Sequence, residues 1–259
     1  MGYFWEWYLY MIYYRKDYNK MPESYKIIAT LGEDELRHLQ KKDTKDVDVL
    51  EIRLDLFSRN YIQKELKKKI KSLGLPALFT YRRAEDSSVK SYVKLFPEDV
   101  EGILKDFNDN ANYLDIELNR EDSIFTNYEN LNFRIIYSYH SFKKSIYAKE
   151  MKEFISNAKP VKKKNPIFKF AITPEDINET ADFLNDIKLL SKTHTMIGIC
   201  MGELGIMSRV FGDHFHSSYT YMTLGEPKAP GQISVETFKK LRGDLFRVNS
   251  IKDSKEEEL

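Results

Sequence analysis

The chain has 259 residues, of which 42% are hydrophobic and 31% are charged, a balance that supports a sizeable core and excludes disorder for most of the chain. Its 41 Lys and Arg residues against 40 Asp and Glu residues give a formal net charge of +1, which excludes the strong positive field of a non-specific nucleic-acid binder. The single cysteine, Cys200, excludes an internal disulfide and fits a reducing compartment, so we expect a cytoplasmic protein.

The first 24 residues are rich in aromatic side chains. Residues 3–14 read YFWEWYLYMIYY, a run that is too short to span a bilayer and contains Glu6. The segment has no basic region and no small-residue cleavage site, so we expect neither a signal peptide nor a membrane protein. It could be an interfacial anchor, but we favour a segment packed on the flank of the domain or an extension upstream of a start at Met21.

Eight short runs rich in β-branched and aromatic residues follow, separated by segments with apolar residues at helical spacing. The runs end at Thr30, Leu56, Arg82, Leu118, His140, Ala171, Gly202 and Leu224. Eight alternations of strand and helix predict an α/β fold, a single-domain (β/α)8 TIM barrel over residues 25–250, with a doubly wound open sheet as the alternative. Residues 251–259 are expected to form a frayed, charged tail.

The segments between the runs contain helix signals. Apolar spacing predicts helices over residues 62–73, 97–107 and 147–158. Thr173 followed by Pro174 predicts a helix with Thr173 as its N-cap. The seventh connection, residues 208–218, has the weakest helical pattern.

Polar side chains fall on one face of each strand, because successive residues of a strand point to opposite faces. Glu51, Arg53 and Asp55 alternate with leucine and isoleucine residues in the second run. The same alternation pairs Thr80 with Arg82, Asp115 with Glu117, and Ser138 with His140. Barrel enzymes carry their active sites at the C-terminal ends of the strands, so these faces predict a polar pocket at the barrel mouth.

Lys169 lies inside an otherwise apolar run. Burial and neighbouring arginines would lower the pKa of this lysine and give a nucleophilic amine. The alternative is a structural lysine paired with Asp115 or Glu117. His140 ends the neighbouring run on the same face, which would place an acid–base group beside the amine.

Two other features point less strongly to chemistry. His214 and His216 form a His-x-His pair that could hold a metal ion, but no third ligand is evident, and we expect no metal site. The lysine-rich residues 64–71 lie opposite the apolar stripe of their helix, so we interpret them as a solvated face and expect no nucleic-acid partner.

Seven motifs in order resemble those of type I 3-dehydroquinate dehydratases. They are EIRLD at 51–55, FTYR at 79–82, DIEL at 115–118, SYHSF at 138–142, FKFA at 168–171, MGELGIMSR at 201–209 and APGQIS at 229–234. The resemblance covers residues 25–245 and implies a (β/α)8 barrel without cofactor or metal. It also implies the dehydration of 3-dehydroquinate to 3-dehydroshikimate, in the shikimate pathway to chorismate and the aromatic amino acids.

The resemblance implies roles for three catalytic residues. Lys169 would form an imine with the C3 ketone of the substrate, and His140 would move protons at C2 and at the C1 hydroxyl. Asp86 stands where the family has a glutamate that orients the histidine, and Glu85 takes that place if the loop is shifted by one residue.

The resemblance also implies a binding set. Arg209 would hold the carboxylate of the substrate, a role that affects substrate capture and leaves thermal stability nearly unchanged. The other binding positions are Thr30, Glu51, Arg53, Arg82, Lys228 and Gln232. Lys228 replaces a small hydroxyl residue of the family, so one substrate contact is expected to differ.

Two other functions fit the same residues. A class I aldolase-type barrel also uses a strand lysine for imine chemistry, and a non-catalytic barrel could bind quinate-like acids. The sequence is compatible with a monomer or a homodimer.

Overall fold

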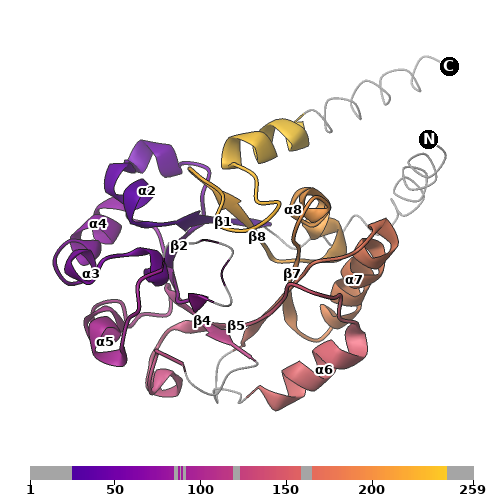
Figure 1. The fold of residues 1–259 in the computed structure, drawn as a ribbon, viewed down its shortest axis with the longest axis horizontal. Coiled ribbons are helices and arrows are strands. Elements are labelled where there is room, and N and C mark those ends of the chain that lie inside the picture. Colours follow the sequence, from indigo (N-terminus) through magenta and orange to yellow (C-terminus); the bar gives the residue numbers. More distant parts are fainter. Residues whose placement is uncertain are drawn as a thin grey trace.

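The computed structural model describes residues 25–84, 87, 89, 92–118, 123–158 and 165–243. In this part of the chain eight strands form a nearly closed barrel, and helices surround it (Figure 1). The predicted (β/α)8 barrel is therefore confirmed, and the open doubly wound sheet is wrong. The N-terminal residues 1–24 and the tail 251–259 lie outside the described residues, so the expectations for them stay predictions.

All strand pairs are parallel: the strands from β1 to β7 pair in sequence order, and β1 also pairs with β8. The strands are β1 (Lys26–Leu31), β2 (Val49–Arg53), β3 (Ala77–Thr80), β4 (Tyr113–Glu117), β5 (Arg134–Ser141), β6 (Ile167–Ile172), β7 (Thr195–Cys200) and β8 (Tyr219–Thr223). Within the described residues, β7 and β8 share no ladder, and a single bridge between Met196 and Ser217 connects their segments. The barrel therefore has a weak seam between β7 and β8.

Helices cover the outside of the barrel (Figure 1). The α-helices are α2 (Glu33–His38), α3 (Arg59–Lys64), α4 (Leu66–Leu73), α5 (Pro97–Asp106), α6 (Ala148–Asn157), α7 (Ile177–Leu190) and α8 (Gly205–Phe211), and residues 235–243 are also helical. Short 3-10 helices occur at η2 (Lys41–Thr44), η3 (Leu54–Leu56), η5 (Tyr128–Asn130) and η6 (Gly212–Phe215). The helix predicted over 62–73 is interrupted at Glu65, between α3 and α4.

The predicted start of α7 was wrong. Asp176, not Thr173, is the N-cap, and its carboxylate accepts hydrogen bonds from the amides of Asn178 and Glu179. The amide of Thr173 instead donates to the carbonyl of Ser141, which continues the hydrogen-bond pattern between β5 and β6. Thr173 is thus fixed in extended backbone, and an acid at the next available position caps the helix.

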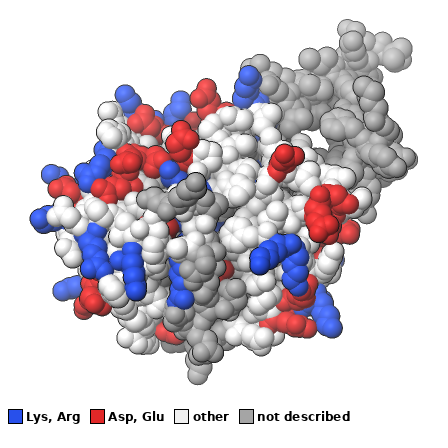
Figure 2. Space-filling model, in the orientation of Figure 1, with Lys and Arg blue, Asp and Glu red and all other residues white. Residues whose placement is uncertain are grey.

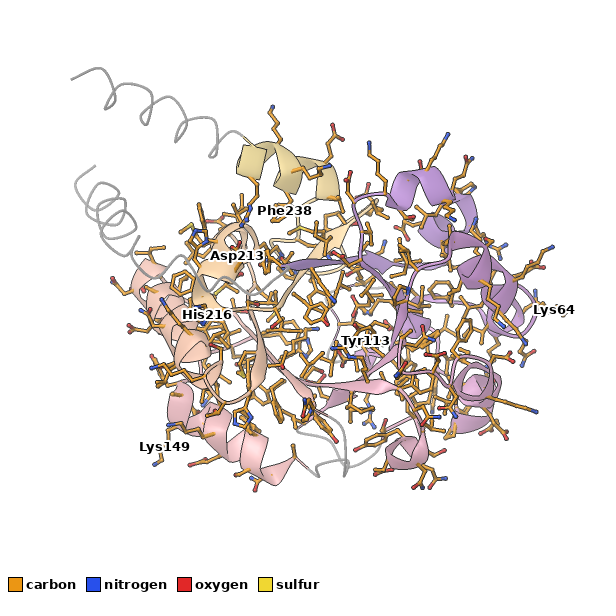
Figure 3. The ribbon with its side chains drawn as sticks, turned by 180° about the vertical axis from the view of Figure 1, so that it is seen from behind. Lys64, Tyr113, Lys149, Asp213, His216 and Phe238 are labelled. Carbon is orange, nitrogen blue, oxygen red and sulfur yellow. The ribbon has the colours of Figure 1, made fainter. Side chains whose placement is uncertain are left out.

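The alternation of side chains along the strands produces two apolar layers. Phe168 and Phe170 face outward and pack beneath the helices, whereas Ile167 and Ala171 face the barrel interior. The inner cluster is Ile28, Val49, Leu78, Tyr113, Ile136, Ile167, Ala171, Ile197, Ile199, Met201, Tyr219 and Tyr221. Tyr113 lies near the centre of the barrel in Figure 3. In each of the strands β1 to β6, an inner apolar residue lies two positions before a polar residue of the same face, so the polar groups collect towards the C-terminal end of the barrel.

The surface seen in Figure 2 carries interspersed positive and negative side chains. Lys64 and Lys149 lie at the periphery of the molecule, away from the barrel interior (Figure 3). Among the described residues, no helix has both the length and the apolar character that a membrane crossing requires.

Candidate active site

A cavity opens among residues at the C-terminal ends of the strands, where barrel enzymes carry their active sites. It encloses about 580 Å³, including its opening to solvent. Nine of the site residues predicted from the sequence line this cavity. They are Thr30, Glu51, Arg53, Arg82, His140, Lys169, Arg209, Lys228 and Gln232. Asp86, and Glu85 as its alternative, lie outside the described residues, so their assigned role stays a prediction.

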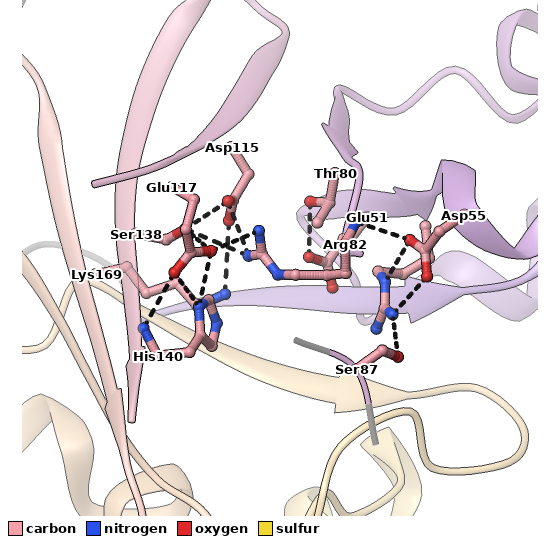
Figure 4. Close-up of polar contacts among 11 residues, drawn as sticks. Glu51, Asp55, Thr80, Arg82, Ser87, Asp115, Glu117, Ser138, His140 and Lys169 are labelled. Atoms are coloured by element: carbon pink, nitrogen blue, oxygen red, sulfur yellow. Dashed lines mark hydrogen bonds and ion pairs between the residues drawn. The ribbon is translucent and has the colours of Figure 1, made fainter. Parts of the chain in front are cut away.

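Arg82 is the centre of a buried ion-pair network (Figure 4). Its guanidinium lies 2.8 Å from Asp115 Oδ1 and 3.0 Å from Glu117 Oε2. The Ser138 hydroxyl also donates a hydrogen bond to Asp115, at 2.5 Å. Burial alone would raise the pKa of Asp115, but the positive charges of Arg82 and Lys169 outweigh burial and hold that pKa well below its usual range. Both partners of this pair are therefore ionised, and the charge of Arg82 is largely balanced inside the protein.

Lys169 lies in the middle of β6, and its side chain is only 7% exposed. Burial lowers the pKa of Lys169, and the Asp115 carboxylate, whose Oδ2 is 3.6 Å from Nζ, offsets this effect only in part. The structure thus agrees in part with each of the two interpretations of Lys169. The amine forms a long ion pair with Asp115, as a structural lysine would, and it lines the cavity, as a nucleophile would. Such an amine is neutral at a lower pH than an ordinary lysine, and neutrality is what nucleophilic addition requires.

His140 lies in β5, on the same face as Ser138, and its side chain pairs with Glu117. Its Nδ1 lies 3.0 Å from Glu117 Oε1, and its backbone amide donates to the same oxygen at 3.2 Å. Burial lowers the pKa of His140, and the Glu117 carboxylate opposes that shift. A carboxylate on one ring nitrogen leaves the other nitrogen available for proton transfer.

Glu117 is a site residue that was not predicted from the sequence. The signal was present in the strand pattern, since Glu117 shares a face with Asp115 and, in register, stands beside Ser138 on β5. The sequence does not specify the register between β4 and β5. In the structure this register places Glu117 beside Ser138, and the Glu117 side chain reaches His140, two residues further along β5.

Glu51 and Arg53 are fixed by their neighbours on the other side of the cavity. The hydroxyls of Thr30 and Thr80 donate to the Glu51 carboxylate at 2.7 and 2.8 Å, so strands on both sides of β2 hold it. Arg53 makes a two-point pair with Asp55, at 2.9 and 2.7 Å. Most of the charge on Arg53 is therefore also balanced within the protein.

Arg209 differs from these cations. Its side chain is buried, and its hydrogen bonds in the described structure go to backbone carbonyls, including those of Cys200 at 2.8 Å, Gly205 at 2.9 Å and Tyr221 at 3.3 Å. Burial lowers the pKa of Arg209 to about 10. Among the described residues no carboxylate pairs with this guanidinium, so a positive charge at the cavity wall is left for an anion.

The loop after β8 closes the remaining side. Gln232 donates hydrogen bonds to Thr30 Oγ1 and to the Met222 carbonyl, both at 3.0 Å. Lys228 donates its backbone amide to Gln232 Oε1 at 2.8 Å, and its ammonium group forms an ion pair with Glu35 on α2. Gly231 has φ of +71°, and a Cβ there would overlap the carbonyl oxygen of Gly202 in the loop after β7, so this position requires glycine.

The described residues contain no cluster of three or more side chains that could hold a metal ion. His214 Nδ1 lies 3.1 Å from Asp213 Oδ1, and His216 Nδ1 lies 3.2 Å from the Ser191 hydroxyl. The two histidines of the His-x-His pair thus have different partners. The backbone of His216 also has a left-handed conformation, with φ of 58°.

Known proteins resemble this chain in sequence. The family model described as type I 3-dehydroquinase matches residues 26–246. The 3-dehydroquinate dehydratase of Methanobrevibacter smithii is 28% identical over 224 residues, covering 86% of this chain and 96% of its own, and that of Methanococcus maripaludis is 30% identical over 207 residues, covering 78% and 89%.

A solved structure agrees at the level of the fold. The crystal structure of 3-dehydroquinate dehydratase from Geobacillus kaustophilus superimposes with a TM-score of 0.69 and 21% identity, and the match covers 87% of this chain and 92% of that one. The family model spans most of the chain, including every strand of the barrel and the cavity described above. The chain belongs to the type I 3-dehydroquinase family.

Proposed function

We propose that this protein dehydrates 3-dehydroquinate to 3-dehydroshikimate through an imine on Lys169, as a step of the shikimate pathway. The observation that carries this proposal is the buried Lys169 amine, whose pKa is lowered, in a cavity shared with His140 and the guanidinium of Arg209. A keto acid with a β-hydroxyl group matches these three groups: the amine reacts with the ketone, the histidine moves protons, and the arginine binds the carboxylate.

The reaction follows from the chemistry of the three groups. The neutral Lys169 amine adds to the C3 ketone, and the resulting hydroxyl leaves as water with a proton supplied by His140, which gives a protonated imine and a neutral histidine. This electron sink acidifies the proton on C2, which His140 removes, and the resulting enamine expels the C1 hydroxyl as His140 returns the proton to it. Water then hydrolyses the unsaturated imine, releases 3-dehydroshikimate and restores the amine. The balance is one water lost from the substrate, with no oxidant or reductant.

Arg209 supplies the binding charge in this proposal. The other cations at the cavity wall have carboxylate partners: Arg82 with Asp115 and Glu117, Arg53 with Asp55, and Lys228 with Glu35. A substrate carboxylate would therefore be drawn to Arg209, although the backbone carbonyls already occupy several of its donors. Thr30, Glu51 and Gln232 offer hydroxyl, carboxylate and amide groups to the hydroxyls of the substrate.

Borohydride reduction in the presence of 3-dehydroquinate, followed by mass mapping, tests the proposal. We expect a covalent adduct on Lys169. Lys169→Ala should lose both adduct and turnover, whereas His140→Ala should keep the adduct while turnover falls by about 10²- to 10⁴-fold. An adduct on another lysine, or turnover without any adduct, would contradict the imine mechanism. Binding of 3-dehydroquinate without turnover in the wild type would indicate a non-catalytic acid binder. The homodimer and the cytoplasmic location stay predictions from the sequence.

A further inference from the structure

The Lys169 amine has a second neighbour besides Asp115. The centre of the Tyr221 ring lies 4.1 Å from Lys169 Nζ, with the nitrogen over the face of the ring. Asp115 Oδ2, at 3.6 Å, is beyond hydrogen-bond distance, and within the described residues the amine has no hydrogen-bond acceptor. The aromatic face is therefore a principal contact of the group that would react.

Tyr221 is held rigidly in this position. It belongs to β8, where it is 5% exposed, stands in register with Ile28 of β1 and lines the same cavity as Lys169. Its backbone carbonyl accepts a hydrogen bond from Arg209 on the side of the strand that faces the seam. The ring thus covers one side of the nitrogen and has little freedom to move away.

The face of an aromatic ring carries partial negative charge, and it attracts a cation more strongly when both groups are removed from water. The charged forms of the Lys169 nitrogen therefore gain more from Tyr221 than the neutral amine does. A protonated imine has one N–H, whereas an ammonium group has three, so the imine can donate fewer hydrogen bonds to carboxylate oxygens. Its positive charge therefore depends more on the diffuse negative charge of the ring face for stabilisation.

We propose that Tyr221 is a further catalytic residue, whose ring stabilises the positive charge of the protonated imine on Lys169 and leaves only the opposite side of the nitrogen open to the ketone. This inference rests on the imine chemistry proposed above. It gives the protein a surface that favours the charged intermediate without adding another carboxylate to the three, Glu51, Asp115 and Glu117, whose charges already act on the amine.

The Tyr221 hydroxyl provides a useful control. Its oxygen is buried and has no hydrogen-bond partner in the described part of the chain. Tyr221→Phe therefore removes only this group and keeps the face of the ring, so it serves as the reference for variants that change the face. Tyr221→Leu removes the ring, and replacement of Tyr221 by trifluorophenylalanine keeps the shape of phenylalanine but withdraws the negative charge from its face.

The first readout is the amount of intermediate. At saturating 3-dehydroquinate, we expect the fraction of enzyme trapped by borohydride and the kcat to fall on the order of tenfold in the leucine and trifluorophenylalanine variants, relative to Tyr221→Phe. Tyr219→Leu is the matched control, because Tyr219 lies two residues earlier on the same face of β8 and has Tyr113 and Lys26 as its contacts. It changes the core without changing the surroundings of the amine.

The second readout is the pH dependence of the trapping rate. The ring favours the charged amine, so its removal should lower the pKa of Lys169 and move the acidic limb of the rate to lower pH, although less imine accumulates. The ionisable groups that face the amine are Glu51 on β2, Arg82 after β3, Asp115 and Glu117 on β4, and His140 on β5. None of them is altered in these variants, so the shift reports on the ring.

The inference is overturned if the leucine and trifluorophenylalanine variants match Tyr221→Phe in trapped fraction and in pH limb, or if Tyr219→Leu reproduces both changes. If Tyr221→Leu does not fold, the trifluorophenylalanine variant decides by itself, since its shape is nearly that of phenylalanine. The absence of any adduct in the wild type would instead refute the imine mechanism, and the two failures are therefore distinguishable.

Discussion

At the scale of single residues, Glu117 joins the two halves of the candidate site. Its carboxylate pairs with Arg82 on one side and with His140 on the other. Burial would raise the pKa of Glu117, but these two neighbours outweigh burial and lower it, so the carboxylate is ionised. An ionised partner fixes the histidine ring and favours its protonated form, which is the form that gives a proton to a leaving hydroxyl.

We therefore expect Glu117→Gln to lower kcat by about 10- to 100-fold. Loss of the negative charge would lower the pKa of His140 further, so the acidic limb of kcat should move to lower pH. The pH profile of kcat for the wild type and the variant measures this shift.

Asp86→Asn is the matched comparison, because the family pattern predicts that Asp86 orients the histidine. A shift in Asp86→Asn that is absent in Glu117→Gln would assign the role to Asp86. A shift in both variants would mean that two carboxylates share the histidine.

At the scale of elements, Arg209 connects strands that do not pair. Its guanidinium donates to Cys200 at the end of β7 and to Tyr221 in β8, across the seam where the described residues form no ladder. From the sequence, we expect this arginine to bind substrate and to contribute little to stability. The structure changes that expectation, because the same side chain also replaces missing backbone hydrogen bonds of the barrel.

Arg209→Lys should accordingly weaken both substrate capture and the fold. An ammonium group cannot reach the same set of carbonyls as the planar guanidinium, so we expect a loss of about 2 kcal/mol in the free energy of unfolding, together with a raised KM. Urea unfolding and steady-state kinetics measure the two effects. Unchanged stability with a raised KM would show that Arg209 acts on the substrate alone, as the sequence predicts.

The loop that contains Lys228 and Gln232 is fastened to α2. The ion pair between Lys228 and Glu35 and the hydrogen bonds of Gln232 hold this loop against the cavity through contacts within the protein. Preorganisation of this kind reduces the ordering cost of binding. Lys228 thus supports the loop from a position where the resemblance implies a small hydroxyl residue.

Glu35→Gln tests the fastening without altering a residue of the cavity. We expect KM to rise about three- to tenfold, while the free energy of unfolding changes by less than about 1 kcal/mol, because the pair is partly exposed. The exposed pair of Arg37 and Glu33 on the same helix offers Arg37→Gln as a control that should leave KM unchanged. An unchanged KM in Glu35→Gln would show that the ion pair does not position the loop.

At the scale of the whole molecule, the ends of the barrel meet in one cluster. Arg242, in the last described helix, makes a two-point pair with Asp213 of η6 at 2.8 and 2.7 Å. The Tyr25 hydroxyl, just before β1, lies 2.9 Å from the Arg209 carbonyl, and its ring centre is 6.3 Å from that of Phe238. Asp213 and Phe238 lie on neighbouring elements in Figure 3.

This cluster should make the fold sensitive to acid. Burial would raise the pKa of Asp213, but His214 and Arg242 outweigh it and lower the pKa from 3.8 to about 2. A carboxyl group with a lowered pKa stabilises the fold fully above its unfolded pKa, and this contribution, about 2 kcal/mol, is lost as the pH falls through the folded value.

We expect Arg242→Met to lower the free energy of unfolding at pH 7 by about 3 kcal/mol, because it leaves a buried carboxylate with one partner fewer. It should also flatten the dependence of stability on pH below pH 4, which urea unfolding over a pH series would measure. Lys67→Met, which removes an exposed pair with Asp106, is the control and should change stability by less than about 0.5 kcal/mol. A similar loss in both variants would contradict the prediction.

The sequence by itself indicated the eight strand–helix alternations of the barrel and the inward polar faces of the second to sixth strands, because the two-residue period of a strand is written locally in the chain. The family resemblance of the sequence implied the binding positions outside the strands, Arg209, Lys228 and Gln232. The sequence could not assign Glu117 to His140, Lys228 to Glu35 or the ring of Tyr221 to Lys169. Those contacts depend on strand register and loop placement between residues far apart in the chain, and only the tertiary structure brings them together. The hydrogen bonds of Arg209 across the seam between β7 and β8 could not be predicted from the sequence either. The sequence does not show that these two strands lack a ladder, which only the closed barrel reveals.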